Sequence, residues 1–412
     1  MFTRRQILAG TAALTARASL QAEEAAPARA ITRGPHFHWF GYYDKLQFDV
    51  SNRYVLGMEV RFEHRPPTPD DTIRIGMVDL QEGDRWIDLG ETHAWCWQQG
   101  CMLQWLPGSR DEVIYNDRAR GQFISHILNV KTGKRRTLPA PVYAVSADAK
   151  WAVYPDFRRL NDTRPGYGYC AIPDPNREQI APKDAGIWRM DLRSGRSELI
   201  FSIAEAFAIP FRHGDWTGAK HWFNHLLFAP EGDRFCFLHR WAWPDRPGRI
   251  TRMFTMDVHG RGRFELMPYG NCSHFIWRDA RHILAWSRHP SHHDRFYVWR
   301  DRSDEVTVVG KDVMTADGHC TYLPGNEWIL NDTYPDAERN QKPYLYHVAS
   351  EKRIELGRFR SPKEYTGEWR CDAHPRYSRD GKLVTVDSPH AGGRQIQLID
   401  VSGIVAAKAR RA

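Results

Sequence analysis

Four histidines in the second half of the chain occupy equivalent places in a recurring sequence pattern. His225, His274, His319 and His374 each lie a few residues before the tight polar turn of an expected hairpin. An imidazole can act as a general base near neutral pH, because its unperturbed pKa is about 6.5, and it is also a common metal ligand. A fold that brings equivalent positions together would therefore gather several such groups at one site.

Cysteines lie within a few residues of three of these histidines, which indicates metal binding. Imidazole and thiolate ligands together suit a transition metal, zinc above others. We predict a divalent metal bound by His274, Cys320 and His374, with zinc favoured and manganese or calcium as alternatives. His319 and Cys371 are alternative ligands. Paired CxxC zinc motifs are absent, and each histidine could instead have a structural or stacking role.

The elements that must position these histidines recur along the whole chain. A run of aromatic and branched residues, a turn rich in Gly, Asp, Asn or Pro, and a second such run form a hairpin signal. The seven copies begin at Leu46, Leu103, Tyr143, Leu226, Phe275, Thr321 and Pro375. A second apolar hairpin follows each copy, which gives four strands per unit. The pattern predicts an all-β fold, a seven-bladed β-propeller with four antiparallel strands per blade. A pair of β-sandwiches also gives many short strands, but the matched hairpin pairs favour the propeller.

The propeller architecture explains the spacing of the histidines. The first strand of each blade lines the axis, so residues that enter it from different blades meet at one mouth of the ring. Gln99 belongs to the same set of positions. Two longer segments interrupt the repeats, a Pro- and Gly-rich one over residues 158–184 and another over residues 203–221. Long loops on a rigid scaffold often carry specificity.

Composition and charge restrict the function classes. The 412 residues are 42% hydrophobic and 12% aromatic, which supports a packed core. The formal net charge is +8, but Lys and Arg are scattered, which argues against a nucleic-acid groove and leaves an anionic ligand possible. The sequence contains no GxSxG, SxxK, Walker or Rossmann glycine motif.

The N-terminal residues predict export. Arg4 and Arg5 precede a short apolar stretch and small residues up to Ala22, which is the layout of a twin-arginine signal peptide. We therefore expect residues 1–30 to be signal and leader, and residues 31–412 to be a single propeller domain in the periplasm or outside the cell. No stretch is apolar for long enough to span a membrane. We expect a monomer.

Several motifs resemble those of polysaccharide lyases. "HFIW" at His274 and "HPRYSRDGK" at His374 are similar to the metal-binding blades of oligogalacturonate lyases. "FNHLLFAPEGDRFCFLHR" is similar to the blade that carries their catalytic histidine. The spacing of Tyr143 and Arg159 resembles that of a tyrosine and an arginine in ulvan lyases and rhamnose–glucuronate lyases. These families are seven-bladed propellers that cleave uronate-containing glycans by β-elimination. The resemblance implies an anionic uronate-containing glycan as substrate.

The resemblance also implies catalytic roles. Elimination requires that the uronate carboxylate be neutralised, that a base take the adjacent proton, and that an acid protonate the leaving oxygen. Arg159, His225 and Tyr143 are the candidates for these three roles in that order. The ulvan-type enzymes place a further histidine ahead of the tyrosine, where this chain has Gln98 and Gln99. His225 would then have to act as the base alone.

Other polar residues are candidates for substrate binding. Asn116 and Arg240 follow predicted inner strands, and Gln99 belongs to the ring of axial positions. Arg212 is the nearest counterpart of an arginine that precedes the base in oligogalacturonate lyases. Two other functions fit the same scaffold: a non-catalytic periplasmic propeller that binds a carbohydrate or a protein, and a glycoside hydrolase, whose paired carboxylates cannot be recognised in a sequence.

Overall fold

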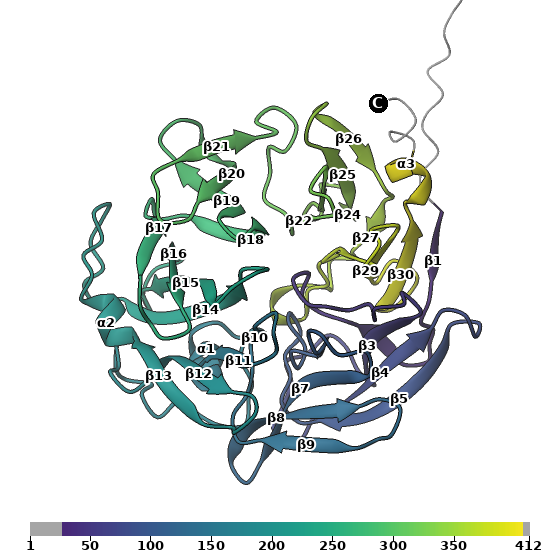
Figure 1. Cartoon of the computed structure of the whole chain (residues 1–412), viewed down its shortest axis with the longest axis horizontal. Coiled ribbons are helices and arrows are strands. Elements are labelled where there is room, and N and C mark those ends of the chain that lie inside the picture. The colour runs from purple at the N-terminus through teal and green to yellow at the C-terminus, as the bar shows by residue number, and fades with distance from the viewer. Residues whose placement is uncertain (1–26, 407–412) are drawn as a thin grey trace, which may run out of the picture.

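The computed structural model describes residues 27–406, which form seven four-stranded antiparallel sheets arranged around a common axis (Figure 1). The predicted seven-bladed β-propeller is thereby confirmed. The predicted twin-arginine signal, with Arg4 and Arg5, lies outside the described residues. None of the helices in the described range is long and apolar enough to cross a membrane.

The first three blades follow one another along the chain, with their strands in sequence order from the axis outwards. Blade one comprises β2 (Phe37–Trp39), β3 (Tyr54–Val60), β4 (Ile73–Asp79) and β5 (Arg85–Thr92). Blade two comprises β6 (Gln104–Trp105), β7 (Glu112–Ala119), β8 (Gln122–Asn129) and β9 (Arg135–Leu138). Blade three comprises β10 (Ala144–Val145), β11 (Trp151–Pro155), β12 (Gly186–Asp191) and β13 (Ser197–Ser202).

The next three blades repeat this order. Blade four comprises β14 (Lys220–Phe228), β15 (Arg234–Ala242), β16 (Ile250–Asp257) and β17 (Phe264–Met267). Blade five comprises β18 (Cys272–Asp279), β19 (His282–His289), β20 (His293–Arg300) and β21 (Val306–Val309). Blade six comprises β22 (Thr321–Tyr322), β23 (Trp328–Asn331), β25 (Tyr344–His347) and β26 (Lys352–Glu355), beside a small sheet of β24 (Asn340–Gln341) and β27 (Phe359–Arg360).

Blade seven joins the two ends of the described chain. Its three inner strands are β28 (Arg376–Tyr377), β29 (Leu383–Ser388) and β30 (Gln395–Asp400), and its outer strand is β1 (Ala28–Ala30). The register pairs Ala28 with Ile399 and Ala30 with Gln397. The propeller therefore begins before the predicted domain boundary at residue 31, because residues of the expected leader close the ring.

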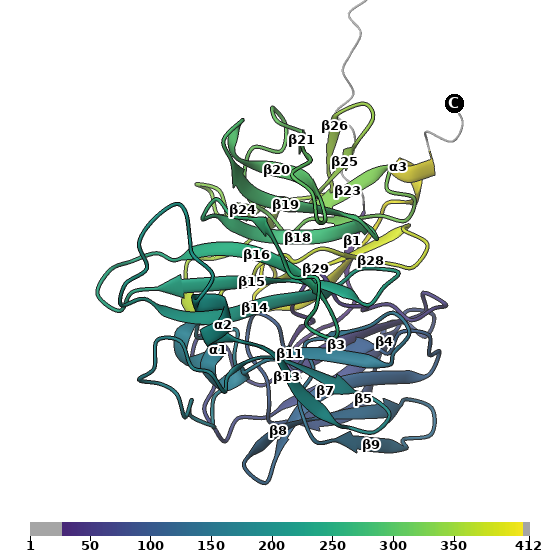
Figure 2. The same ribbon diagram turned by 60° about the vertical axis from the view of Figure 1, so that its left-hand side comes forward.

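Short helices lie in the connections. The insertion of blade three contains α1 (Phe157–Thr163), and α2 (Ile203–Phe207) follows β13 with a capping box. Both helices contact the inner strand β14 of blade four, as the turned view shows (Figure 2). A 3₁₀ helix, η1 (Gly367–Trp369), precedes blade seven, and α3 (Ser402–Ala406) follows it. The two predicted insertions thus pack onto the strand that carries His225.

Aromatic side chains fill the space between neighbouring blades. Trp39 of β2 packs against Trp95 and Trp97, with ring centroids 5.9 and 5.5 Å away, and all three side chains are buried. Large rings suit this position because blades diverge from the axis and leave a widening gap. The abundance of tryptophan in the sequence therefore serves packing between blades at these positions.

The ring closure gives a test of stability. Ile31 follows β1, is buried among side chains of blades one and seven, and donates its backbone N–H to the Ile396 carbonyl at 2.9 Å. We expect Ile31→Ala to lower the free energy of unfolding by about 2–5 kcal/mol, because it leaves a cavity where the ends of the chain meet. Urea unfolding measures this. The control Ile180→Ala changes a side chain that is 40% exposed and should shift stability by about 0.5 kcal/mol or less. If the two substitutions lowered the free energy of unfolding equally, the claim that Ile31 stabilises the closure of the ring would be wrong.

Candidate functional site

The histidines of blades four to seven meet near the axis of the ring. The ring centroids of His274 and His319 lie 4.1 Å apart, and those of His319 and His374 lie 4.2 Å apart. His225 joins them through Tyr42, whose ring centroid lies 4.8 Å from that of His225 and 5.1 Å from that of His374. All of these side chains are buried. The structure therefore brings together the four histidines singled out by their spacing.

Local irregularities turn these side chains towards the axis. The pairing of β14 shifts register between Asn224 and Leu227, and His225 has a φ of 54°. The pairing of β18 shifts between Cys272 and Phe275, around His274. His374 has a φ of 42° just before β28. Bulges and left-handed residues re-aim side chains and are common beside functional sites.

Tyr42 and Tyr43 form the centre of the site, and sequence reasoning missed both. They belong to the "GYYDK" segment between β2 and β3. The Tyr43 hydroxyl donates to the Phe275 carbonyl at 2.9 Å and accepts from the Phe275 N–H at 2.8 Å, which ties blade one to blade five. A signal was present, because two tyrosines, Asp44 and Lys45 stand just ahead of the first inner hairpin, as the histidines do ahead of theirs.

His225 has the environment of a neutral base. Its Nε2 lies 3.4 Å from Asp44 Oδ2, its Nδ1 lies 3.5 Å from the Tyr42 hydroxyl, and its ring stacks on Phe275 at 4.0 Å. Burial lowers the pKa of His225 to about 3, and the Asp44 carboxylate offsets only part of this. With the Nε2 proton facing Asp44, Nδ1 is left with the lone pair that can accept a proton.

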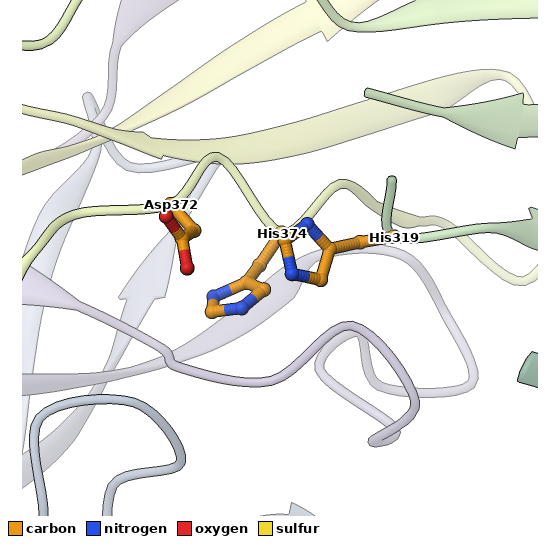
Figure 3. A group of neighbouring side chains, drawn as sticks. All are labelled: His319, Asp372 and His374. Carbon is orange, nitrogen blue, oxygen red and sulfur yellow. The ribbon is translucent and has the colours of Figure 1, made fainter. Parts of the chain in front are cut away.

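His319, Asp372 and His374 form a group that could hold a metal ion. Each offers one ligand atom, and these atoms all lie within 4.8 Å of one another (Figure 3). The Nε2 atoms of His319 and His374 are buried and have no hydrogen-bond partner, so two nitrogen donors are unused. Nδ1 of His319 lies 2.9 Å from Asp332, which fixes the orientation of the ring as carboxylates do behind metal-bound histidines. The residues present therefore fit a divalent metal.

The predicted ligand set agrees with this group only in part. His374 and the alternative ligand His319 belong to it, but His274 places its Nδ1 2.9 Å from Asp317 instead. Cys320 packs in the hydrophobic core between blades five and six, and burial raises the pKa of its thiol well above the usual value. A protonated core thiol is a poor ligand.

The cysteine assignment is thus corrected in favour of Asp372, which carries no recognisable spacing signal. The alternative ligand Cys371 is likewise buried, and burial raises the pKa of its thiol. It does not belong to the group of His319, Asp372 and His374.

Arg159 is engaged elsewhere than the sequence predicted. It lies in α1 and is buried, and every N–H of its guanidinium has an acceptor. These acceptors are the carbonyls of His221, Asn176, Gln179 and Ile180 and the Asp174 carboxylate. No N–H group is left to hold a substrate carboxylate. The predicted role of Arg159 as carboxylate neutraliser is therefore not supported, and the residue instead fastens the insertion to β14.

Tyr143 contacts both Gln99 and Lys45. The Tyr143 hydroxyl accepts a hydrogen bond of 2.7 Å from Gln99 Nε2, and the Lys45 ammonium lies 4.9 Å from the centre of the Tyr143 ring. Burial raises the pKa of Tyr143 well above its usual value. Gln98, the other residue in place of the lyase histidine, donates to the backbone carbonyls of Glu368 and Arg370.

The predicted substrate-binding residues differ in their environments. The Asn116 amide is used up in bonds to the Val142 backbone and the Tyr169 hydroxyl, so it links blades two and three. Arg212 is exposed in the connection after α2. Arg240 of β15 is buried, and its Nε has no hydrogen-bond partner.

Three arginines form a positively charged group that we call the arginine cluster: Arg164, Arg240 and Arg249. None of them forms an ion pair with a carboxylate of residues 27–406, and Nη1 of Arg164 also lacks a hydrogen-bond partner. Desolvation and, to a smaller extent, Arg164 together lower the pKa of Arg249 to about 10. Burial, followed by Arg164 and Arg249, likewise lowers the pKa of Arg240. The cluster therefore lacks an anion within the described chain.

Comparison with known proteins supports the fold. No protein-family model matches the chain, and no curated protein matches it. The oligogalacturonate lyase of Vibrio parahaemolyticus has a TM-score of 0.65 at 12% identity, over 92% of this chain and 95% of that chain. An oligogalacturonate lyase in complex with manganese has a TM-score of 0.65 at 15% identity, over 92% and 94%. At these identities the likeness establishes a shared propeller fold.

The environment of Arg159 leads to an expected change in stability. Arg159→Ala removes five buried hydrogen bonds, among them the ion pair with the buried Asp174 carboxylate, so we expect a loss of more than about 4 kcal/mol in unfolding free energy. The neighbouring Arg158→Ala breaks only a partly exposed pair with Asp156 and should lower it by about 1 kcal/mol or less. Urea unfolding of both variants provides the comparison. Wild-type stability of Arg159→Ala would show that the guanidinium is not a structural anchor.

Proposed function

We propose that the protein cleaves uronate-containing glycans by β-elimination. The observation that carries this proposal is the contact of one ring, Tyr42, with both His225 and His374. Tyr42 thereby links the neutral His225 imidazole to a member of the metal-binding group, and Arg240 and Arg164 lie close enough to Tyr42 to offset part of the rise in its pKa. The shared fold of oligogalacturonate lyases, one of them in complex with manganese, supports it further.

His225 supplies the base. The proton next to a uronate carboxylate is weakly acidic, so the group that removes it must be unprotonated before the reaction and stabilised in its protonated form afterwards. Burial keeps the His225 imidazole neutral, and Asp44, at 3.4 Å from Nε2, stabilises the imidazolium that forms. A bound anionic substrate would raise the proton affinity of the ring further.

The arginine cluster supplies the carboxylate site that Arg159 does not. A guanidinium holds a carboxylate through two parallel hydrogen bonds, and charge that develops next to that carboxylate is stabilised by the same cation. Arg240 is buried with an unused Nε, and Arg164 has an unused Nη1. A uronate carboxylate would satisfy these donors and compensate their charge, whereas the hydroxyls of a neutral sugar would supply no compensating charge.

The metal-binding group would lie beside the same substrate. His319, Asp372 and His374 would hold the ion, and a divalent cation supplies Lewis-acid polarisation of a carboxylate oxygen when bound. Two imidazoles and one carboxylate suit manganese as well as zinc. Without the Cys320 thiolate, the donor set gives no preference for zinc.

We further propose that the protein acts outside the cytoplasm as a monomer. The twin-arginine motif supports export, where polymeric glycans would be met. A single propeller also contains every residue to which the reaction assigns a role, so the proposed chemistry requires no second copy.

The proposed base has a direct kinetic test. We expect the wild type to release unsaturated uronates, detected by their ultraviolet absorbance, from galacturonate oligomers or from a glucuronate-containing glycan. His225→Ala should lower kcat by about 10²–10⁴-fold, since it removes the proton acceptor. His292→Ala, which changes an exposed histidine of blade five, is the control and should retain wild-type turnover. New reducing ends without unsaturated product would indicate a hydrolase, and binding without any product would indicate a non-catalytic propeller.

Metal binding is tested by calorimetric titration with manganese chloride. We expect His374→Ala to weaken binding by more than about 100-fold, because even residues behind metal ligands contribute about 10–100-fold. Cys320→Ala removes a thiol from the core and should leave the affinity for manganese within a few-fold of the wild type. If Cys320→Ala weakened binding as much as His374→Ala, the thiolate-containing ligand set would be right after all.

A further inference from the structure

Tyr167 is a residue of the blade-three insertion that reaches the axial site. The Gly166 carbonyl accepts a hydrogen bond of 3.2 Å from the Gln98 N–H, which holds the insertion against the segment ahead of blade two. The ring of Tyr167 then lies 6.5 Å from that of Tyr42, in an edge-on arrangement. Tyr42 in turn contacts His225. A loop that is absent from the other blades therefore places a phenol one ring away from the proposed base.

The hydroxyl of Tyr167 is held by cations. Arg370 Nη2 donates to it at 2.5 Å, and the Arg164 guanidinium lies 4.0 Å from the centre of its ring. Because the oxygen accepts from Arg370, the hydrogen of the hydroxyl itself is available for donation. Once that hydrogen had left, the phenolate would face two guanidinium groups at close range. This geometry favours release of the proton at this position.

The other axial tyrosines have the opposite environment. Burial raises the pKa values of Tyr42, Tyr43 and Tyr143 well above the usual range. Burial acts on Tyr167 in the same direction, but Arg370 and Arg164 outweigh it and lower its pKa to about 7. Tyr143 moreover has its oxygen occupied by Gln99. Of these four phenols, Tyr167 is the one matched to proton transfer near neutral pH.

We propose that Tyr167 is the general acid that protonates the leaving glycosidic oxygen, in the role first considered for Tyr143. This inference rests on the proposed β-elimination. In the step, His225 Nδ1 takes the proton from the carbon next to the carboxylate, and the electron pair of that bond forms a carbon–carbon double bond. The bond from the neighbouring carbon to the glycosidic oxygen breaks, and this oxygen keeps the electron pair and receives the Tyr167 proton. An imidazolium and a phenolate remain, and transfer of one proton from the first to the second through solvent restores both.

The arginines of the site would have two separate functions. Arg370, which donates to the Tyr167 hydroxyl, stabilises the phenolate together with the charge of Arg164. The unused Nε of Arg240 and Nη1 of Arg164 would hold the substrate carboxylate. Both functions act on charge that appears or concentrates during the reaction, which is the stabilisation that raises turnover. The absence of ion pairs in the arginine cluster is then a requirement of the chemistry, because a protein carboxylate would neutralise it.

The pH dependence follows from the groups around Tyr167. The charged and titratable groups that influence it are Arg164 in its own insertion, Arg370 and Asp372 ahead of blade seven, Arg240 and Arg249 of blade four, Tyr42 ahead of blade one, and Tyr334 of blade six. A general acid acts in its protonated form, so kcat should fall as the pH rises through about 7. His225 acts in its neutral form, so protonation of this ring should lower kcat only as the pH falls towards about 3.

The test compares Tyr167→Phe with the wild type on two leaving groups. With a sugar as leaving group, we expect Tyr167→Phe to lower kcat by about 10²–10⁴-fold and to lose the fall in rate above neutral pH. With a nitrophenyl ether on the same uronate, whose nitrophenolate departs without a proton, the loss should be less than about 10-fold. Tyr154→Phe, a buried tyrosine of β11 away from the arginines, is the matched control, and thermal melting checks the fold of both variants.

The outcomes separate the inference from the proposed function. If Tyr167→Phe lost the same factor in kcat on both leaving groups, or kept wild-type turnover, Tyr167 would not be the general acid. Unsaturated product from the wild type would still support the proposed elimination in that case. Retention of the fall in rate above neutral pH by Tyr167→Phe would also overturn it. If the wild type formed no unsaturated product from either substrate, both would fail.

Discussion

Imidazole rings can be buried side by side only if they do not all carry charge, and this constraint shapes the centre of the propeller. The rings of His274, His319 and His374 form a row, and Asp332 holds the middle one. Burial disfavours charge on His319, but Asp332 outweighs it and raises the pKa of this ring. Burial lowers the pKa values of His274 and His374, and His319 lowers both further. His374 therefore stays neutral, with a free Nε2 lone pair at the metal-binding group.

Carboxylates also fix the backbone between blades, which places the rings. Asp332 accepts hydrogen bonds from the N–H groups of His319 and His374, at 2.7 and 3.2 Å, and so joins blades six and seven. Asp387 accepts from the Phe40 and Gly41 N–H groups and positions the segment that carries Tyr42. The arginine cluster departs from this pattern of pairing. Its buried member, Arg240, is an unpaired cation that opposes folding, and such local conflicts are expected where a site binds an anion.

The sequence predicted the blades and the convergence of the histidines, because hairpin periodicity fixes which residues enter inner strands. It could not predict which side chains engage one another there. The thiol of Cys320 lies in the hydrophobic core, and Asp372 offers the third ligand atom of the metal-binding group instead. The periodicity of the hairpins does not encode which way a side chain points at the end of a strand. Arg159 is held by backbone carbonyls, which leave no mark in a sequence. Tyr167 reaches the axis through an irregular insertion, and only the folded loop shows its arginine neighbours.

The masses of the reaction products test the central claim most directly. Elimination divides a glycan without adding water, so the masses of the two fragments sum to the mass of the parent. The fragment from the reducing side of the cleaved bond carries the double bond at its new non-reducing end. Hydrolysis adds one water at each cut. Mass spectrometry of defined galacturonate and glucuronate oligomers, treated with the wild-type protein and manganese, distinguishes the two reactions. We predict fragments that sum to the parent mass. Fragments that together carry one additional water, or intact oligomers throughout, would contradict the assignment of a uronate-eliminating site.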